Sequence, residues 1–247
     1  MKICWLVTSA IDIENRVFFN DKIPRTAFGT DERFRQTQFT INNINLVCPN
    51  SKIFIVDISK NFEHYRKLFA YKSNVEYVSI EELDSESAEL CRTHKSRGLT
   101  ESTLIDIFMQ RYADQIKQYD YMIKMSGRYF HMGFDTSVLN EQNRDKFFFR
   151  YIKAWPWEDE WNYSKEFAID DKLHWAETIN FGVGRDLIDY FAEGMSKMRQ
   201  FYIDFPNYGN MDFEVIMFFV VRHRPIIQPV EWPVGGWRGG NGEFVEW

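Results

Sequence analysis

The sequence predicts an α/β protein whose mostly parallel sheet is flanked by helices. Two short apolar runs, residues 2–7 and 53–58, are typical of buried parallel strands. Between them, apolar residues recur every three to four positions over residues 31–47, and Pro49 closes the segment, which indicates an amphipathic helix. Strands and helices that alternate in this way form parallel sheets, whose ligand sites lie at the carboxyl ends of the strands.

The rest of the chain continues the alternation. Strands are predicted at 75–80, 119–125, 147–152 and 178–183, and helices from an N-cap at Thr100 to Ile116, at 185–202 and at 211–222. The 211–222 helix is apolar almost all round, which is typical of a buried helix. Residues 229–247 are glycine-rich and are predicted to be an ordered loop or a flexible flap. No repeat or linker divides the chain, so residues 1–247 are expected to form one domain.

Composition excludes some classes of protein. Lys and Arg number 30 against 36 Asp and Glu, and the net charge of −6 argues against a generic basic nucleic-acid binder. Three widely spaced cysteines without a C-x-x-C pair suggest neither a disulfide framework nor a zinc site. The first apolar run is too short for a signal peptide or a membrane span, so we expect a cytoplasmic protein, with peripheral contact at the inner face of the membrane left open.

Small polar residues and cations stand at the ends of the predicted strands. The sequence contains no G-x-G-x-x-G, P-loop, H-E-x-x-H or G-x-S-x-G motif, which argues against dinucleotide oxidoreductases, P-loop enzymes, zincins and ordinary α/β-hydrolases. The strand-end residues with chemistry to offer are Thr8, Ser9, Asp57, Lys95, Arg97, Lys124, Ser126 and Arg128.

These elements and residues, over roughly residues 1–225, resemble the GT-A fold of nucleotide-sugar glycosyltransferases, particularly bacterial enzymes that build capsule, lipooligosaccharide or O-antigen. The resemblance lies in the strand ending at Thr8-Ser9, the helix with Arg33-x-Arg35-Gln36-Thr37, the strand around Asp57, the Lys95-x-x-Gly98 turn and the segment Tyr119–Lys124. It implies that residues of about 1–130 bind a nucleotide-sugar donor through Thr8, Ser9, Asp57, Lys95, Arg97, Lys124 and Ser126. Residues of about 131–247 would then bind an oligosaccharide or lipid-linked glycan acceptor.

The place where such enzymes usually carry a metal-binding Asp-x-Asp reads Ser126-Gly127-Arg128 here. Preorganised cations can stabilise a leaving diphosphate as a metal does, and the planar fork of arginine binds phosphate oxygens bidentately. We therefore expect that no divalent metal is required, with Arg128 as the stabilising cation; its alternative is an ordinary strand-end ion pair. If Mg²⁺ or Mn²⁺ is bound, the oxygen-rich triplet Glu158-Asp159-Glu160 is the alternative site.

Two acidic residues at the start of the last helix are candidates for the catalytic base. In inverting enzymes of this type a carboxylate late in the chain deprotonates the acceptor hydroxyl, whereas a retaining enzyme needs no such residue. Asp212 lies where a carboxylate also serves as a helix cap. Glu214 lies two residues deeper, where burial would raise its pKa; its alternative is an ion pair with Arg222 or Arg224.

Three tryptophans offer apolar faces to a sugar acceptor, or simply pack: Trp155, Trp157 and Trp161. The sequence therefore predicts a glycosyltransferase acting on a cell-surface glycan. Two alternatives remain open at this point. One is a sugar nucleotidyltransferase, which would normally carry a glycine-rich, lysine-bearing signature after the first strand. The other is a non-catalytic nucleotide- or carbohydrate-binding module of the same fold.

Overall fold

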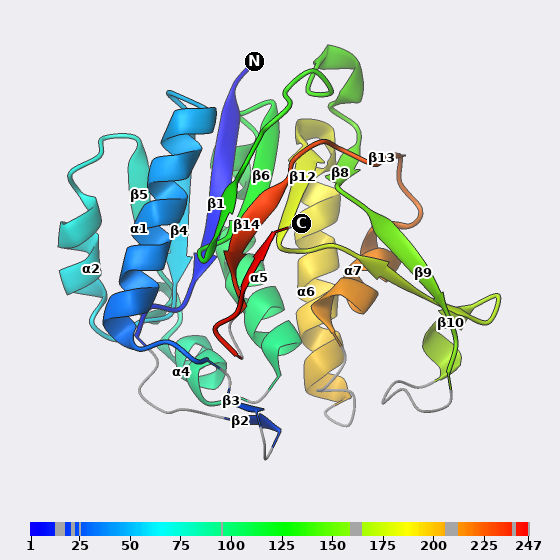
Figure 1. Cartoon of the computed structure of the whole chain (residues 1–247), viewed down its shortest axis with the longest axis horizontal. Helices are drawn as coiled ribbons and strands as arrows, with labels where there is room; N and C mark the ends of the chain where they lie inside the picture. Colours follow the sequence, from blue (N-terminus) through cyan, green and yellow to red (C-terminus); the bar gives the residue numbers. More distant parts are fainter. Residues whose placement is uncertain are drawn as a thin grey trace.

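A seven-stranded sheet runs through the middle of the molecule (Figure 1), in the order β13-β8-β12-β6-β1-β4-β5. The computed structural model describes residues 1–12, 26–94, 96–158, 165–205, 212–238 and 241–246, and the backbone of residues 18–20 and 23–24. The strands of the sheet are β1 (Ile3–Ser9), β4 (Lys52–Asp57), β5 (Val75–Ser79), β6 (Tyr121–Ser126), β8 (Phe147–Phe149), β12 (Asn180–Gly184) and β13 (Ile226–Ile227).

The sheet is mostly parallel, as the sequence predicted. β1 pairs in parallel with both β4 and β6, and β4 pairs in parallel with β5, whereas β12 runs antiparallel between β6 and β8. The strand predicted over 147–152 is in fact two strands. β8 ends at Phe149, and a separate strand, β9 (Ile152–Pro156), leaves the sheet to pair elsewhere.

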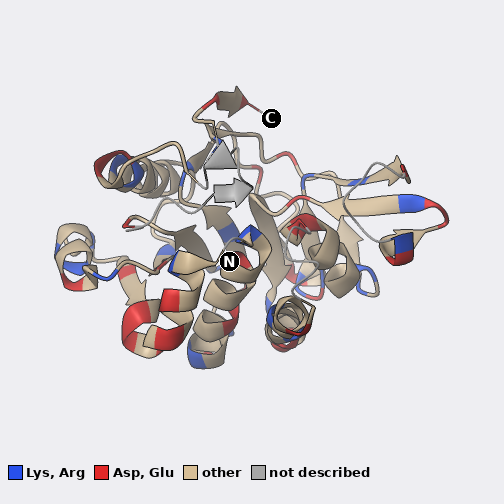
Figure 2. Ribbon diagram, turned by 90° about the horizontal axis from the view of Figure 1, so that it is seen from below, with Lys and Arg blue, Asp and Glu red and all other residues tan. Residues whose placement is uncertain are grey.

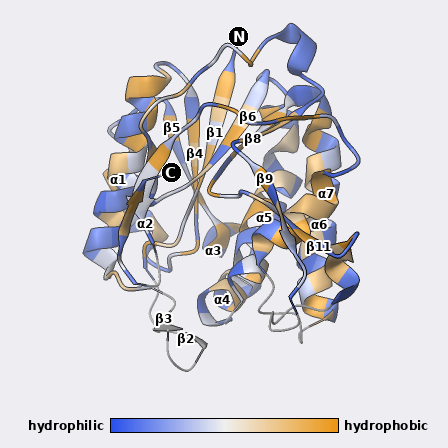
Figure 3. Cartoon of the chain, turned by 45° about the vertical axis from the view of Figure 1, so that its right-hand side comes forward, coloured by the Kyte–Doolittle hydropathy of each residue, from blue (hydrophilic) through white to orange (hydrophobic). Residues whose placement is uncertain are grey.

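Helices cover both faces of the sheet, and alternate residues of β1 show why. Trp5 and Val7 pack in one core with Ile41 and Ile44 of α1 (Thr30–Val47), while Leu6 packs in the other core, against the helices on the far side. The strand is buried on both faces, which is why its sequence is a continuous apolar run. Much of the ribbon of β1 and β4 is accordingly orange in the hydropathy view (Figure 3).

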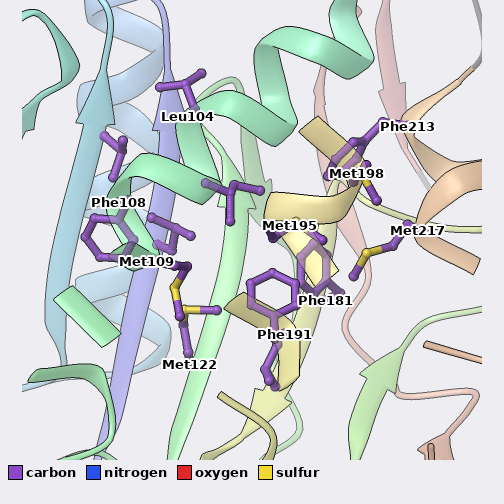
Figure 4. Packing of buried hydrophobic residues seen from close by; sticks show 14 of the residues in the cluster. Leu104, Phe108, Met109, Met122, Phe181, Phe191, Met195, Met198, Phe213 and Met217 are labelled. Carbon is purple, nitrogen blue, oxygen red and sulfur yellow. The ribbon is translucent and has the colours of Figure 1, made fainter. Parts of the chain in front are cut away.

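The second core lies between the sheet and three helices. Figure 4 shows Leu104 and Phe108 of α5 (Arg97–Ile116), Met195 and Met198 of α6 (Ile188–Asp204), and Met217 of α7 (Phe213–Val221) converging on Met122 and Phe181 of the sheet. The predicted helices over 185–202 and 211–222 are thus confirmed. The other helices are α2 (Phe62–Phe69), α3 (Ile80–Leu83) and α4 (Ser85–Thr93), with short 3₁₀ helices at Glu141–Asn143, Lys165–Phe167 and Arg185–Leu187.

The N-cap of α5 is Ser96, and the prediction of Thr100 was wrong. The Ser96 side chain accepts a hydrogen bond from the backbone N–H of Leu99, whereas the Thr100 hydroxyl lies one turn inside the helix and donates to the carbonyl oxygen of Ser96 at 3.0 Å. Serine and threonine are both favourable residue types at an N-cap, so residue type did not distinguish the two positions. The earlier start adds a turn that carries Arg97 and Gly98 into the helix.

The glycine-rich tail forms strands, so the prediction of a loop or flap was wrong. Tail strands β14 (Val234–Trp237) and β15 (Phe244–Glu246) pair with each other, and β14 also pairs with β7 (Tyr129–His131). The glycines permit this, because a Cβ on Gly236 would lie 2.5 Å from the carbonyl oxygen of Arg128. The remaining strands are β2 (Phe18–Asn20), β3 (Ile23–Pro24), β10 (Ala168–Ile169) and β11 (Lys172–Ala176), which pairs with β9 and β10.

The end of β12 gives a stability prediction. A Cβ added at Gly184 would lie 2.2 Å from the backbone carbonyl oxygen of Arg144, and a backbone atom cannot move aside cheaply. Gly184→Ala should therefore lower the free energy of unfolding by about 2–3 kcal/mol in urea titrations. Gly133→Ala is the matched control, because its Cβ would meet only ordinary contacts at 3.6 Å or more and should change stability by less than about 0.5 kcal/mol. Equal stabilities for the two variants would contradict the packing described here.

Candidate functional site

The carboxyl ends of β1, β4 and β6 meet at one edge of the sheet, which is the lower edge in Figure 1 and faces the viewer in Figure 2. Their register places Thr8 beside Ser126 and Ser9 beside Asp57. Hydroxyl side chains that the sequence placed at separate strand ends are therefore neighbours.

A pocket of about 120 Å³ opens at this edge, between the ends of β1 and β6 and the first turns of α1 and α5. It brings together five of the predicted site residues: Thr8, Ser9, Arg97, Ser126 and Arg128. Its other lining residues are Ala10, Arg33, Thr37, Thr100, Glu101, Leu104 and Gly127.

Three arginines make the pocket cationic. Arg33 comes from the first turns of α1, Arg97 is the first residue of α5, and Arg128 lies in the turn after β6. Burial lowers the pKa of Arg97, the positive charge of Arg128 lowers it further, and the carboxylates of Asp212 and Glu214 oppose the shift. Guanidinium groups gathered at the first turns of two helices form a site suited to an anion with several oxygen atoms.

Gly127 sets the position of Arg128. Its backbone N–H donates to the carbonyl oxygen of Thr8 at 2.9 Å, and a Cβ at this position would lie 3.2 Å from both that oxygen and the Thr37 hydroxyl. The next N–H, that of Arg128, donates back to the carbonyl oxygen of Ser126 at 2.8 Å. The chain therefore turns sharply beside β1 and presents the Arg128 side chain to the pocket.

Lys124 lies beneath the pocket and is buried. Its ammonium group contacts the Glu101 carboxylate at 2.6 Å, the Ser126 hydroxyl at 2.8 Å and the carbonyl oxygen of Thr178 at 2.6 Å. The Thr8 hydroxyl also donates to Glu101, at 2.9 Å. Burial alone would raise the pKa of Glu101, but Lys124 and the Thr8 hydrogen bond hold it below its usual value. All three donors of Lys124 are used within the protein, so its role is to join the elements around the pocket.

Glu214, in the first turn of α7, is within electrostatic range of Arg97. Its carboxylate accepts a hydrogen bond of 2.8 Å from the Thr178 hydroxyl. Burial, and then the charge of Asp212, raise the pKa of Glu214 to about 7, and the Thr178 hydrogen bond and Lys124 act in the opposite direction. Asp212 is the N-cap residue of α7, but its side chain makes no capping hydrogen bond and is exposed. The structure thus brings both candidate carboxylates to the arginines.

Asp57 lies at the carboxyl end of β4, fully buried. One carboxylate oxygen accepts from the Ile11 N–H at 2.9 Å, and the other accepts from the Ser59 N–H at 2.8 Å and the Tyr77 hydroxyl at 2.7 Å. These bonds hold the loop that follows β1 against β4 and β5. A nucleotide contact by Asp57 remains a prediction.

Trp155, Trp157 and Glu158 are not among the residues that line the pocket. Trp155 is 48% exposed on β9, which projects from the body of the molecule, and Trp157 packs partly buried against the main core. Glu158 is exposed beside Trp157. The predictions for Lys95, Asp159, Glu160 and Trp161 fall outside the described residues.

Four residues of this region were not predicted from the sequence. Glu101 lies one turn after Arg97 and binds Lys124, and Thr178, the partner of Lys124 and Glu214, precedes β12. Buried Tyr129, the first residue of β7, feels the charges of Arg128, Glu214, Arg238 and Arg97, while burial raises its pKa. Asn180 is fully buried at the start of β12, and neither amide atom has a hydrogen-bond partner among the described residues. The contacts of Glu101 and Thr178 join distant segments, so no local pattern in the sequence pointed to them.

The pocket does not fit a divalent metal. Mg²⁺ and Mn²⁺ prefer carboxylate and carbonyl oxygens. Among the described residues that line the pocket, Glu101 is the one carboxylate, and it is bonded to Lys124 and Thr8. Arg33, Arg97 and Arg128 would repel a cation. Elsewhere in the described ranges, no three His, Cys, Asp or Glu side chains gather in a way that could hold a metal ion.

Comparisons with known proteins identify the fold but no family. No family model matches the chain, and no curated protein matches it by sequence. An active-site mutant of LgtC matches with a TM-score of 0.50 at 8% identity, over 92% of this chain and 72% of that one. The galactosyltransferase LgtC in complex with donor and acceptor sugar analogues gives 0.49 at 8%, over 92% and 73%. A 4-diphosphocytidyl-2C-methyl-D-erythritol synthase from Anaerococcus prevotii gives 0.44 at 13%, over 92% and 86%.

The likeness to the LgtC mutant supports a GT-A-like fold, in agreement with the sequence prediction. No helix in the described part of the chain is long and apolar enough to cross a bilayer.

The Lys124 network predicts a specific pattern of stabilities. Lys124→Met should lower the free energy of unfolding by about 3 kcal/mol, because Glu101 loses the cation that balances its partly buried charge. The double variant Lys124→Met/Glu101→Gln should recover much of this loss, since no unpaired charge is left. Urea unfolding of the wild type, Lys124→Met, Glu101→Gln and the double variant measures both effects. A Lys124→Met protein as stable as the wild type would contradict the network.

Proposed function

We propose that this chain is a glycosyltransferase that moves a sugar from a nucleotide-sugar donor to a glycan acceptor without requiring a divalent metal. The observation that carries the proposal is the pocket in which Arg33, Arg97 and Arg128 meet at the carboxyl edge of a GT-A-like sheet. Ligands of open α/β sheets bind at this edge. The diphosphate of the donor lies among the guanidinium groups, and the hydroxyls of Ser9, Thr37 and Ser126 supply further hydrogen bonds.

Arg97 and Arg128 stabilise the leaving group. When the bond between the anomeric carbon and the phosphate oxygen breaks, its electron pair stays on the nucleoside diphosphate. Fixed cations lower the barrier because they already point to the place where this charge grows. Arg97 comes from the start of α5 and Arg128 from the turn after β6, so the two cations approach the diphosphate from different elements.

Glu214 is the proposed base. Its carboxylate takes the proton of the acceptor hydroxyl while that oxygen forms the new bond to the anomeric carbon. A pKa of about 7 suits this task, because the group is deprotonated often enough to act and basic enough to accept a proton. Thr178 holds one of its oxygens in place. Asp212, exposed at the helix start, is the second candidate for this role.

The acceptor reaches Glu214 from the side of β9. Tyr151, just before this strand, lies close enough for the Glu214 charge to influence its pKa, and Trp155 is exposed farther along. Trp155 and Trp157 are therefore proposed to contact the acceptor. Buried Asn180 is a candidate for binding sugar hydroxyls, since its amide has both donors and an acceptor to offer. The acceptor class proposed is a cell-surface glycan, met at the cytoplasmic face of the membrane.

A panel assay tests the function. Uridine, cytidine and guanosine diphosphate sugars are each incubated with the protein and a set of oligosaccharide acceptors, in the presence of a chelator. The expected products are a nucleoside diphosphate and an extended glycan. In a parallel incubation with a nucleoside triphosphate and a sugar phosphate, release of pyrophosphate would instead indicate a nucleotidyltransferase. Saturable nucleotide-sugar binding with no turnover would indicate a binding module.

Arg128→Ala should lower kcat on the order of a hundredfold, because the charge-assisted hydrogen bonds to the leaving diphosphate are lost. Arg128→Lys should lose less, since it keeps the charge but not the planar fork. Arg111→Gln on the exposed surface of α5 is the control and should leave kcat unchanged. A folded Arg128→Ala protein with wild-type turnover would show that this residue does not stabilise the leaving group.

The turnover of the wild type should depend on pH through Glu214. Because the base must be deprotonated, kcat should rise about tenfold per pH unit at low pH and level off above an apparent pKa of about 7. Glu214→Gln should abolish the inflection and lower kcat by about a hundredfold or more while donor binding is kept. Asp212→Asn is the companion variant and should keep the inflection. If Asp212→Asn loses it and Glu214→Gln keeps it, the base is Asp212.

A further inference from the structure

The outer face of the small sheet β15-β14-β7 is aromatic, and the pairing register explains why. Phe130 lies opposite Gly235, and Trp237 lies opposite Phe244, so all four residues share one face of the sheet. Residues at the alternate positions of these strands face inward. Tyr129, Val234 and Val245 pack in the core there, and His131 is buried beside them. An antiparallel sheet with one buried face normally turns polar residues to the solvent. This sheet turns three aromatic rings outward.

These rings meet a fourth from helix α1, and together they form a surface that we call the aromatic platform: Phe39, Phe130, Trp237 and Phe244. The Phe39 and Phe130 rings are 4.9 Å apart, and the Trp237 and Phe244 rings are 5.5 Å apart. Phe39 and Phe244 remain 47% and 46% exposed. Gly235 makes room for the Phe130 ring, since a Cβ there would lie 2.8 Å from it.

The backbone joins the aromatic platform to the arginine-lined pocket. The backbone N–H of Trp237 donates to the carbonyl oxygen of Arg128 at 3.2 Å, so the platform is attached to a residue of the pocket. Buried Tyr129, between Arg128 and Phe130 in the chain, is within electrostatic range of Glu214 and of Arg238 at the end of β14. A ligand on the platform would therefore extend from the same pocket edge that holds the donor.

A carboxylate shares the face of the rings. Glu246 lies opposite Gly235 in the register and is exposed, so its carboxylate is on the same face as Phe130 and Trp237. A carboxylate accepts hydrogen bonds from hydroxyl groups. The aromatic faces carry partial negative charge and attract the C–H groups of a sugar ring. A carboxylate repels an anionic bilayer, so a neutral, hydroxyl-rich ligand fits this face better.

We infer that the aromatic platform binds a glycan: it holds sugar residues of the acceptor on the opposite side of the pocket from β9. This inference rests on the proposed function for the identity of the glycan as acceptor. It assigns a role to Phe39 and to the C-terminal strands.

The test uses Phe39→Ser, Phe244→Ser and the double variant. These substitutions remove exposed rings and leave the inward-facing residues of the sheet, such as Tyr129, unchanged. Leu46→Ser is the matched control, because Leu46 is exposed on the same helix and lies outside the platform. An immobilised panel of defined oligosaccharides without nucleotide measures glycan binding directly. In parallel, the KM for the acceptor and acceptor-independent hydrolysis of the nucleotide sugar are measured on the same proteins.

The double variant should bind the retained oligosaccharides about tenfold more weakly and raise the acceptor KM by a similar factor, with donor hydrolysis and the Leu46→Ser control unchanged. Unchanged glycan affinity in the double variant, or no glycan retained by the wild type, would overturn the inference while leaving turnover of nucleotide sugars intact. Platform-dependent glycan binding without any turnover would instead support it and defeat the proposed function. Two other results would assign the platform to another partner and overturn the inference. One is a dimer of the wild type that sedimentation shows to be lost in the double variant. The other is vesicle binding that is lost in the double variant while glycan binding is unchanged.

Discussion

The geometry of the site depends on the ion pair and hydrogen bonds of the buried Lys124 ammonium group. This group joins β6, helix α5 through Glu101, and the segment before β12 through the carbonyl oxygen of Thr178. Thr178 in turn holds Glu214 of α7. Removing a lysine from water is costly unless its donors are satisfied, and here three acceptors satisfy them. One buried charge therefore fixes the relative positions of the arginine-lined pocket and the proposed base, which come from distant parts of the chain.

The distribution of charge around this centre suits an anionic leaving group. Arg33, Arg97 and Arg128 line the pocket, while Glu101, its nearest carboxylate, is occupied by Lys124. Burial and then the charge of Arg128 lower the pKa of Arg97, and Asp212 adds to the effect of burial in raising the pKa of Glu214. Like charges held together are unfavourable without a ligand, and a bound diphosphate would relieve the repulsion among the arginines.

Much of the fold could be predicted from the sequence, because continuous apolar runs and a helical period mark the buried strands and the main helices. Five pocket residues were predictable too, since parallel strands bring their carboxyl ends together. The N-cap at Ser96 was not, because Thr100 satisfies the same local rule. The tail strands were missed because Gly235 and Gly236 have poor strand propensity, and only their close approach to Phe130 and Arg128 explains them. Glu101, Thr178 and Asn180 depend on contacts between distant segments, for which the sequence has no local signal.

The arginines of the pocket are proposed to hold the diphosphate of a nucleotide sugar without a divalent metal. Titration calorimetry with uridine, cytidine and guanosine mono- and diphosphates, in the presence of a chelator, measures this binding. The preferred diphosphate should bind at least about tenfold more tightly than its monophosphate, and Arg97→Gln/Arg128→Gln should remove this difference. Equal affinity for the two phosphates, or diphosphate binding that is seen only when Mn²⁺ or Mg²⁺ is added, would show that the arginines do not hold the diphosphate in this way.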